Sequence, residues 1–294
     1  MSTNHERFTV GDIECVALCD GTLPYPPNWF FSNAATEDVE TELRARQLPT
    51  DHVLSSYTCL LVRTGKECVL VDTGAGGLVP GTGQLPQKLQ ELGVSPQQVT
   101  AVLLTHGHPD HIGGVLDKAG KPAFPSARYV MSRTEYNFWM GAPSLDRLAL
   151  EQFIKDMMLN GTRRSLPPLK AQLELVDVEA EIVPGVRALA APGHTPGHIA
   201  VLLSSGKEQL LHVADAVLHP VHLAHPEWRA AFDLDPEIAG ATRQKLLDWV
   251  AADRVPVHAY HFPFPGHGAI SKRGLAWDWE PQAEKLARQA DNVA

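Results

Sequence analysis

The chain has 294 residues, of which 44% are hydrophobic and 20% are charged, and its formal net charge is -9. A nucleic-acid partner is not expected, because binding to phosphate needs a concentrated basic face that this acidic sequence lacks. No stretch approaches the roughly 20 apolar residues of a membrane span, so no membrane partner is expected either. The start "MSTNHERFTVGD" has no charged and then apolar signal pattern, which favours a cytoplasmic location.

The first third of the sequence predicts short strands divided by turns. Residues 8–21 alternate as a strand pair does, and residues 52–74 predict two strands joined at "RTGKE". Between them, residues 22–52 begin with prolines and aromatics and end in a short helix. We expect this loop and helix segment to cover a pocket or to pack against a second copy of the chain as a homodimer.

Later segments alternate between helical and strand patterns. Helices are predicted at 85–93, 132–140, 144–161 with Gly161 as its end, and 236–253; strands are predicted at 99–105, 173–178, 186–191, 199–206, 209–215 and 255–262. The two halves share a rhythm of strands followed by a helix. This favours one α/β domain over residues 1–294, a four-layer αββα sandwich in which helices flank two packed mixed β-sheets.

A histidine-rich motif, "THGHPDHIGG" at 105–114, follows the apolar run that ends at Leu104. In an extended stretch His106 and His108 point the same way and can reach one cation, and a turn through Pro109 redirects Asp110 and His111 toward a second point. A lone HxH is a weak signal, but HxHxDH favours a metal site.

Further ligands are needed from elsewhere, because a catalytic metal takes about three protein ligands and keeps one open position. His194 in "APGHTPGH", Asp215 in "LLHVAD" and His261 in "VHAYHF" each follow a predicted strand, where α/β folds gather their sites. His258 competes with His261, which is preferred because it adjoins the "FPFPG" block.

Five blocks follow one another along the chain: "VDTG", "THGHPDHIGG", "PGHTPGH", the Asp at a strand end and the late His. In this order they resemble the metallo-β-lactamase superfamily over nearly the whole chain. The resemblance implies that fold and two metal sites. His106, His108 and His194 would bind one ion, Asp110, His111 and His261 the other, and Asp215 would bridge them.

Within the superfamily, "HFPFPGHGAI" followed by "GLAWDWEP" resembles the methyl parathion hydrolase-like branch, whose relatives include N-acyl homoserine lactonases. The resemblance to antibiotic-cleaving members is weaker, because those generally lack a carboxylate at the position of Asp215. Many signalling lactonases carry a tyrosine three residues after that aspartate, whereas this sequence has Leu218, as in the methyl parathion hydrolase group.

The implied chemistry is hydrolysis by a hydroxide that bridges two divalent ions, with Asp110 and Asp215 as the catalytic carboxylates. Imidazole and carboxylate ligands suit Zn²⁺ best, although Fe, Mn or Co are also accepted. Asp72 and His198 are expected to orient the ligands from behind. Apolar side chains are expected to contact the substrate, namely Trp29, Phe30, Leu218, Trp228 and Phe264.

The sequence therefore predicts a binuclear metal-dependent hydrolase of lactones or of aryl and carboxylic esters, with phosphotriesters as side substrates. Two alternatives stay open. One is a glyoxalase II-like thioester hydrolase, although no basic helical tail for glutathione is evident. The other is a non-hydrolytic metal or redox protein, although the oxygen-reducing members tend to have a glutamate where this chain has His108.

Overall fold

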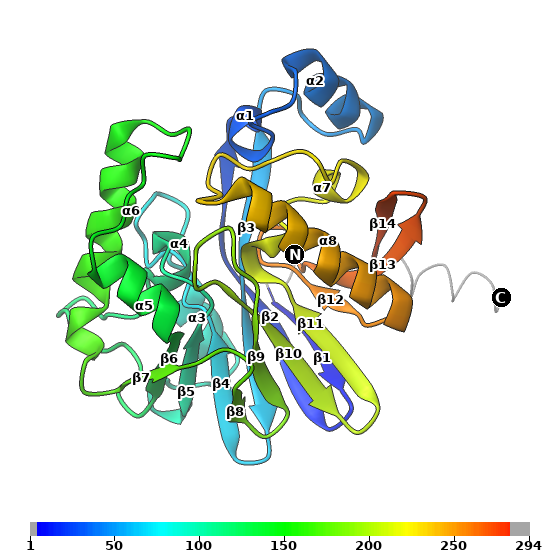
Figure 1. The fold of residues 1–294 in the computed structure, drawn as a ribbon. Helices are drawn as coiled ribbons and strands as arrows, with labels where there is room; N and C mark the ends of the chain where they lie inside the picture. Colours follow the sequence, from blue (N-terminus) through cyan, green and yellow to red (C-terminus); the bar gives the residue numbers. More distant parts are fainter. Residues whose placement is uncertain (1–4, 283–294) are drawn as a thin grey trace.

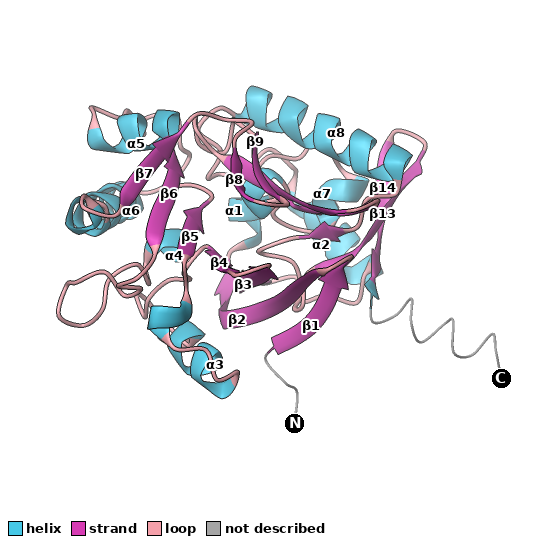
Figure 2. Ribbon diagram, turned by 90° about the horizontal axis from the view of Figure 1, so that it is seen from below, coloured by secondary structure: helices cyan, strands magenta, loops and turns pink. Residues whose placement is uncertain are grey.

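The computed structural model describes residues 5–282 and consists of two seven-stranded sheets packed face to face, with helices on both outer faces (Figures 1 and 2). The predicted αββα sandwich is confirmed. In the first sheet the strands follow chain order: β1 (His5–Val10), β2 (Ile13–Tyr25), β3 (Val53–Thr64), β4 (Glu67–Val71), β5 (Ala101–Leu104), β6 (Arg128–Ser132) and β7 (Leu173–Val176).

The second sheet runs in the reverse order of the chain. Its strands are β14 (Ala276–Pro281), β13 (His267–Arg273), β12 (Val257–His258), β11 (Glu208–His212), β10 (Ile199–Ser205), β9 (Val186–Ala190) and β8 (Glu181–Val183). Both sheets are mixed: β4 to β7 pair in parallel, as do β11 and β12, and the other neighbours pair antiparallel.

Alternation along the strands explains the layering. On β3, Cys59 and Leu61 pack toward the helices outside the first sheet, while Leu60 and Val62 pack between the two sheets. On β10, Val201 faces the space between the sheets and its neighbours face outward. Because successive strand residues point to opposite faces, a strand buried on both faces is apolar throughout.

The helices lie on the two outer faces and around the open edge of the sandwich (Figure 2). They are α1 (Pro27–Phe30), α2 (Thr36–Ala45), α3 (Leu85–Glu91), α4 (Pro109–Ile112), α5 (Arg133–Met140), α6 (Gln152–Ser165), α7 (Val221–Ala224) and α8 (Pro236–Asp253). Short 3-10 turns occupy Pro96–Gln98, Pro167–Leu169 and Ala214–Ala216. Helix α3 buries Leu85 and Leu89 against the first sheet, and α8 buries Leu247 and Val250 against the second.

Two sequence predictions are wrong in detail. Helix α6 begins at Gln152, passes through Gly161 and continues to Ser165, just before Pro167. A Cβ on Gly161 would lie 3.1 Å from a carbon of Pro109, so this glycine permits close packing of α6 on α4 and does not end the helix.

The start of the predicted 22–52 loop is part of strand β2. Residues 22–25 pair with β3 in continuous register, ending at Tyr25 opposite Val53, so their backbone groups are satisfied within the sheet. The rest of the segment forms α1 and α2 at the top of the sandwich (Figure 1). Across residues 5–282, no helix combines the length and apolar character needed to cross a membrane.

Candidate metal centre

The seven predicted ligands converge at one edge of the sandwich, where several strands end. His106 and His108 follow β5, and the short helix α4 begins at Pro109 and carries the next two ligands of the motif. The other ligands follow second-sheet strands: His194 comes after β9, Asp215 lies in the 3-10 turn after β11, and His261 comes after β12.

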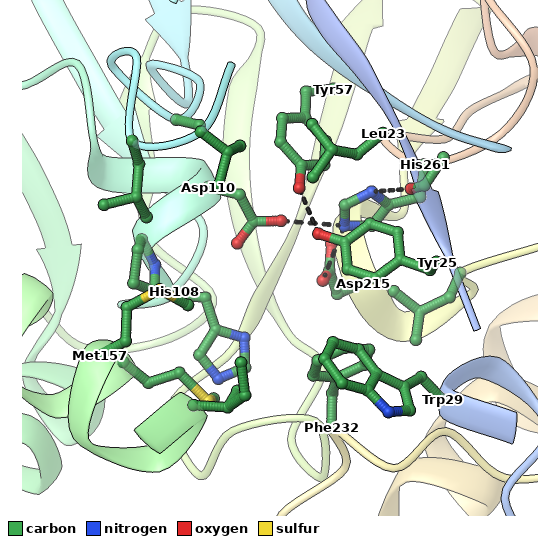
Figure 3. Close-up of a pocket in the computed structure, with 18 of the residues that line it drawn as sticks. Leu23, Tyr25, Trp29, Tyr57, His108, Asp110, Met157, Asp215, Phe232 and His261 are labelled. Carbon is green, nitrogen blue, oxygen red and sulfur yellow. Dashed lines mark hydrogen bonds and ion pairs between the residues drawn. The ribbon is translucent and has the colours of Figure 1, made fainter. Parts of the chain in front are cut away.

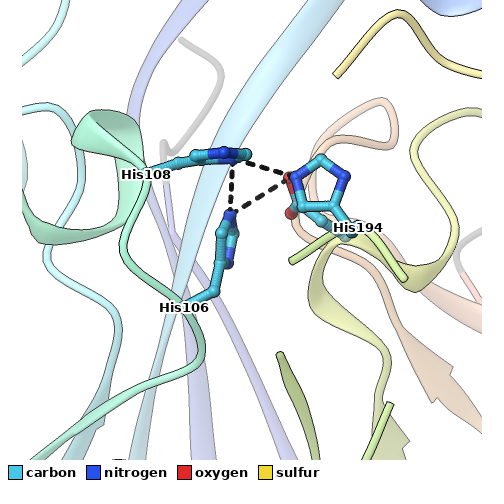
Figure 4. Close-up of side chains that lie close together, drawn as sticks. His106, His108 and His194 are labelled. Atoms are coloured by element: carbon cyan, nitrogen blue, oxygen red, sulfur yellow. Dashed lines mark hydrogen bonds and ion pairs between the residues drawn. The ribbon is translucent and has the colours of Figure 1, made fainter. Parts of the chain in front are cut away.

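One group consists of three imidazoles and a carboxylate (Figure 4). The Nδ1 atom of His108 lies 3.0 Å from His106 Nε2 and 2.9 Å from His194 Nε2. Asp215 Oδ2 lies 3.1 Å from His194 Nε2 and 3.7 Å from His106 Nε2. All four ligand atoms lie within 4.8 Å of one another, so a single cation could contact them all.

Asp110, His111 and His261 form the second group, whose ligand atoms are equally close together. Asp110 Oδ2 lies 3.5 Å from His261 Nε2 and 3.8 Å from His111 Nε2. Asp215 faces this group as well, because its Oδ1 lies 3.1 Å from His111 Nε2 and its Oδ2 lies 3.2 Å from His261 Nε2. The Asp215 carboxylate therefore lies between the two groups.

The unsatisfied atoms at this point fit a cation. His111 Nε2 and Asp215 Oδ1 are buried and face each other, yet neither has a hydrogen-bond partner among the described residues. Buried polar atoms without a partner cost free energy, and so many lone pairs converging on one space need a positive charge between them. The donor set of imidazoles and carboxylates matches two adjacent divalent metals.

The pKa values of the ligands reflect both burial and the Asp215 charge. For His111 and His194 burial is outweighed by Asp215, which raises the pKa of both rings. Burial, together with neighbouring imidazoles, holds the pKa of His106 and His108 well below its ordinary value, so both rings keep neutral lone pairs. Burial alone would raise the pKa of Asp215, but His111 and His261 hold it well below its usual range. Asp215 is therefore an anion with imidazoles on several sides.

Hydrogen bonds behind the ligands fix the orientation of their rings. Asp72, with φ at 59°, accepts a hydrogen bond of 2.8 Å from His111 Nδ1 and two more from the amide and hydroxyl of Thr105. His261 Nδ1 lies 2.8 Å from the Ser55 hydroxyl. These contacts direct the Nε2 atoms of both histidines into the site.

His198 is placed behind the carboxylate, because its Nε2 accepts a hydrogen bond of 3.1 Å from the Asp215 amide. Sequence reasoning missed a similar partner for His194, whose Nδ1 lies 2.9 Å from Asp233 Oδ1. The buried Arg243 of α8 donates to Asp233 and to the carbonyls of Ala216 and Trp228. No motif marks Asp233, which lies 39 residues after its histidine.

Glu135 is a second buried carboxylate that the sequence did not identify. Its Oε1 accepts hydrogen bonds from the Gly107 amide and the Trp139 indole, and its Oε2 accepts from the Thr195 hydroxyl and the Gly197 amide. It therefore joins the two loops that carry His106, His108 and His194. The sequence contains one signal for its burial. Glu135 is a charged residue four positions before Trp139, on the apolar side of a predicted helix.

An apolar cavity of about 260 Å³ opens onto the ligands (Figure 3). Three residues predicted to contact the substrate, Trp29, Phe30 and Leu218, line it, as does Phe232. Further walls come from β2 and β3 of the first sheet, α6 and the loop after β4, including Leu23, Tyr25, Tyr57, Leu78, Val79, Phe153, Ile154, Met157 and Met158. The predominance of apolar atoms suits a hydrophobic substrate group.

Two predicted contact residues lie elsewhere. Trp228 packs against Phe31 and stacks on His225, whose ring centroid is 4.0 Å away, and it does not line the cavity. Phe264 also lies outside the lining, in the turn after His261. His258 is not among the ligands, because its Nδ1 lies 2.7 Å from that of His212 between the sheets.

A family model, described as "Metallo-beta-lactamase superfamily", matches residues 53–261. The chain belongs to this superfamily. Its structure is similar to AidC, a dizinc quorum-quenching lactonase in complex with a product, with 29% identity, a TM-score of 0.89, and coverage of 95% of this chain and 97% of that one. A hydrolase of the beta-lactamase superfamily, AbOPH, has 27% identity and a TM-score of 0.86, with 96% and 98% covered.

Among curated proteins, an N-acyl homoserine lactonase from Bacillus sp is 27% identical over 237 residues, which cover 74% of this chain and 82% of the lactonase. The lactonase resemblance of the sequence is thereby confirmed. Together with the two adjacent ligand groups, these relatives support a metal-dependent hydrolase of ester bonds with two divalent metals.

Proposed function

We propose that this chain is a binuclear metal hydrolase that opens lactones carrying an apolar acyl group and also cleaves aryl and carboxylic esters. The observation that carries the proposal is the Asp215 carboxylate, which lies between two ligand groups at the end of an apolar cavity. The lactonase relatives support the choice of substrate class.

His106, His108 and His194 would hold one ion, Asp110, His111 and His261 would hold the other, and Asp215 would contact both. We propose Zn²⁺, which imidazole and carboxylate ligands favour, although Fe, Mn and Co accept the same ligands. When bound, the two cations make water acidic and polarise the ester carbonyl.

The protein's own groups supply the rest of the mechanism. Asp110 is the most exposed carboxylate of the site and lines the cavity. The carboxylate oxygen that is not directed at the cation can take a proton from the attacking water and give that proton to the leaving oxygen when the ester bond breaks. Asp72, His198 and Asp233 hold the ligands in orientation through the hydrogen bonds described above.

The cavity walls exclude water and hold the acyl or aryl group. Trp29, Phe30 and Phe232 form a cluster of tilted and edge-on rings on one side, and Met157 lies opposite (Figure 3). Such a wall offers few hydrogen-bond partners for the hydroxyl groups of a sugar. It therefore favours an N-acyl lactone or an aryl ester over a polar substrate.

A substrate panel on metal-loaded protein tests the proposal. We expect kcat/KM to be highest for an N-acyl lactone, lower for a 4-nitrophenyl ester and lowest for a phosphotriester, and to be lost after chelation. Preferential cleavage of a glutathione thioester would favour the glyoxalase II-like alternative. A coloured iron centre without hydrolysis of any of these substrates would favour the redox alternative.

The homodimer and the cytoplasmic location stay predictions from the sequence. Light scattering of the purified protein tests the first. A mass of one chain of 32.0 kDa would exclude the homodimer, and a mass of two chains would support it.

A further inference from the structure

Two tyrosines from neighbouring strands meet above the ligands. Tyr25 ends β2, Tyr57 lies in β3, and their hydroxyl oxygens are hydrogen-bonded to each other. Figure 3 shows both hydroxyls pointing toward the space shared with Asp110, Asp215 and His261. Both tyrosines line the cavity, so their hydroxyls lie beside the reacting groups.

One of the two hydroxyl protons of this pair is free to donate a hydrogen bond to another molecule. Two phenols carry two donor protons, and their mutual hydrogen bond uses one of them. Among residues 5–282, neither hydroxyl has another hydrogen-bond partner. One O–H group is therefore left to donate to a molecule in the cavity.

The two tyrosines differ in how deeply they are buried. Tyr57 is only 2% exposed, and its ring is held by Tyr260, at 6.1 Å between centroids, and by His261, at 5.5 Å. Tyr25 is partly exposed, and its ring contacts Trp29 and Phe232. Either hydroxyl can donate to the other, but a proton is left for a molecule in the cavity on the more exposed Tyr25 when Tyr57 is the donor of the pair.

We propose that Tyr25 is a catalytic residue that donates a hydrogen bond to the leaving oxygen of the ester, and that Tyr57 is a positioning residue that holds the Tyr25 hydroxyl. The pair lies on the side of the second ligand group, next to Asp110 and His261. This inference rests on the proposed hydrolase function.

The step balances without a further reactant. The oxygen of the attacking water bonds to the acyl carbon as Asp110 takes its proton. The carbon–oxygen bond to the leaving group then breaks, and its electron pair remains on the leaving oxygen. The Tyr25 hydrogen bond stabilises that charge, the phenolic proton stays on Tyr25, and the oxygen receives the proton that Asp110 took from the attacking water. Preorganised donors aimed at developing charge are effective in a site that excludes water.

Leaving-group dependence separates this role from a structural one. A nitrophenolate needs little stabilisation, whereas the alkoxide released from a lactone or an ethyl ester needs much. We expect Tyr25→Phe to lower kcat/KM about 100-fold for an N-acyl lactone and an ethyl ester, but only about threefold for a 4-nitrophenyl ester. Tyr57→Phe should lower kcat/KM for the lactone and the ethyl ester about tenfold, because the Tyr25 donor remains but loses the hydrogen bond that holds it in place.

Tyr136→Phe is the matched control, since this residue of α5 lies outside the cavity lining and its hydroxyl has no hydrogen-bond partner among the described residues. It should behave as the wild type. Metal content and thermal stability are measured for every variant, and Tyr25→Phe should keep both.

The outcomes are distinguishable. An active wild type with Tyr25→Phe equal to it, or with the same loss on all three substrates, would overturn the role of the phenol pair and leave the proposed hydrolase standing. A metal-loaded wild type that hydrolyses none of the three would overturn the proposed function and, with it, this inference.

Discussion

Single buried carboxylates that lie behind the ligands stabilise the loops of the metal centre. Glu135 accepts hydrogen bonds from four donors on the helix and the two ligand loops that surround it. A Cβ on Gly197 would lie 2.1 Å from the Glu135 amide, so the loop approaches α5 as closely as only glycine allows. Burial raises the pKa of Glu135 above its ordinary value, while these four donors act in the opposite direction.

Glu135→Gln tests this residue. The side-chain amide of glutamine carries N–H groups, which would face N–H and O–H groups that now donate to the carboxylate. Some of these buried donors would therefore lose their acceptor. We expect a loss of about 2 to 4 kcal/mol in the free energy of unfolding, measured by urea denaturation. Glu40→Gln, at an exposed i,i+4 pair with Arg44, should change it by less than about 0.5 kcal/mol. Equally small losses in the free energy of unfolding for Glu135→Gln and Glu40→Gln would contradict this role of Glu135.

At the scale of elements, α8 links the outer layer to the site. It begins at Pro236, where Asp235 caps it by accepting a hydrogen bond of 3.1 Å from the Ile238 amide. About two turns further along the helix, the fully buried Arg243 contacts Asp233 and the carbonyls on either side of α7. The helix thereby supports both the His194 ring and the chain that follows Asp215.

Arg243→Met should therefore affect stability and metal retention together. It would leave the Asp233 carboxylate buried without its cation, and we expect a loss of about 3 to 5 kcal/mol in the free energy of unfolding. Lys245→Met, an exposed position of the same helix, should change stability by less than about 0.5 kcal/mol. Denaturant unfolding, paired with metal analysis, measures both effects. Wild-type stability in Arg243→Met would refute this role of α8.

Sequence patterns located the candidate ligands and most strands because each signal is local. The motif around His106 and the strand before Asp215 can each be identified within a few residues. Asp233 and Glu135 could not be identified in this way, since only the folded chain brings them next to His194 and the loop at Gly107. The hairpin of β13 and β14 was also missed. Polar and apolar residues alternate only weakly along these strands, so the hairpin is evident only from the antiparallel pairing of the two strands in the folded chain.

At the scale of the whole molecule, three histidines that belong to neither ligand group lie where the two sheets meet. His212, His258 and His267 occupy adjacent strands of the second sheet, and Phe8 of the first sheet stacks on His267 at 4.1 Å. Glu6 Oε2 is 3.9 Å from His267 Nδ1. Burial lowers the pKa of His212 and of His267 to about 4, and burial together with the neighbouring histidines holds the pKa of His258 well below its ordinary value.

This cluster predicts acid sensitivity of the fold. A histidine whose pKa is lower in the folded state binds its proton more readily when unfolded, so the free energy of unfolding decreases as the pH falls from about 6.5 to about 4. His267→Gln removes one such group and should reduce that decrease by roughly 3 kcal/mol. Urea denaturation of the metal-loaded wild type and variant across this pH range measures it, and parallel curves would contradict the prediction.

We propose that seven side chains bind two cations that share the Asp215 carboxylate. Calorimetric titration of Zn²⁺ into chelator-treated protein tests this most directly, with the wild type and Asp215→Ala compared at one pH. We predict two tightly bound equivalents for the wild type and loss of at least one of them in the variant, with most activity lost as well. Two wild-type equivalents in Asp215→Ala, or none in the wild type, would contradict the account.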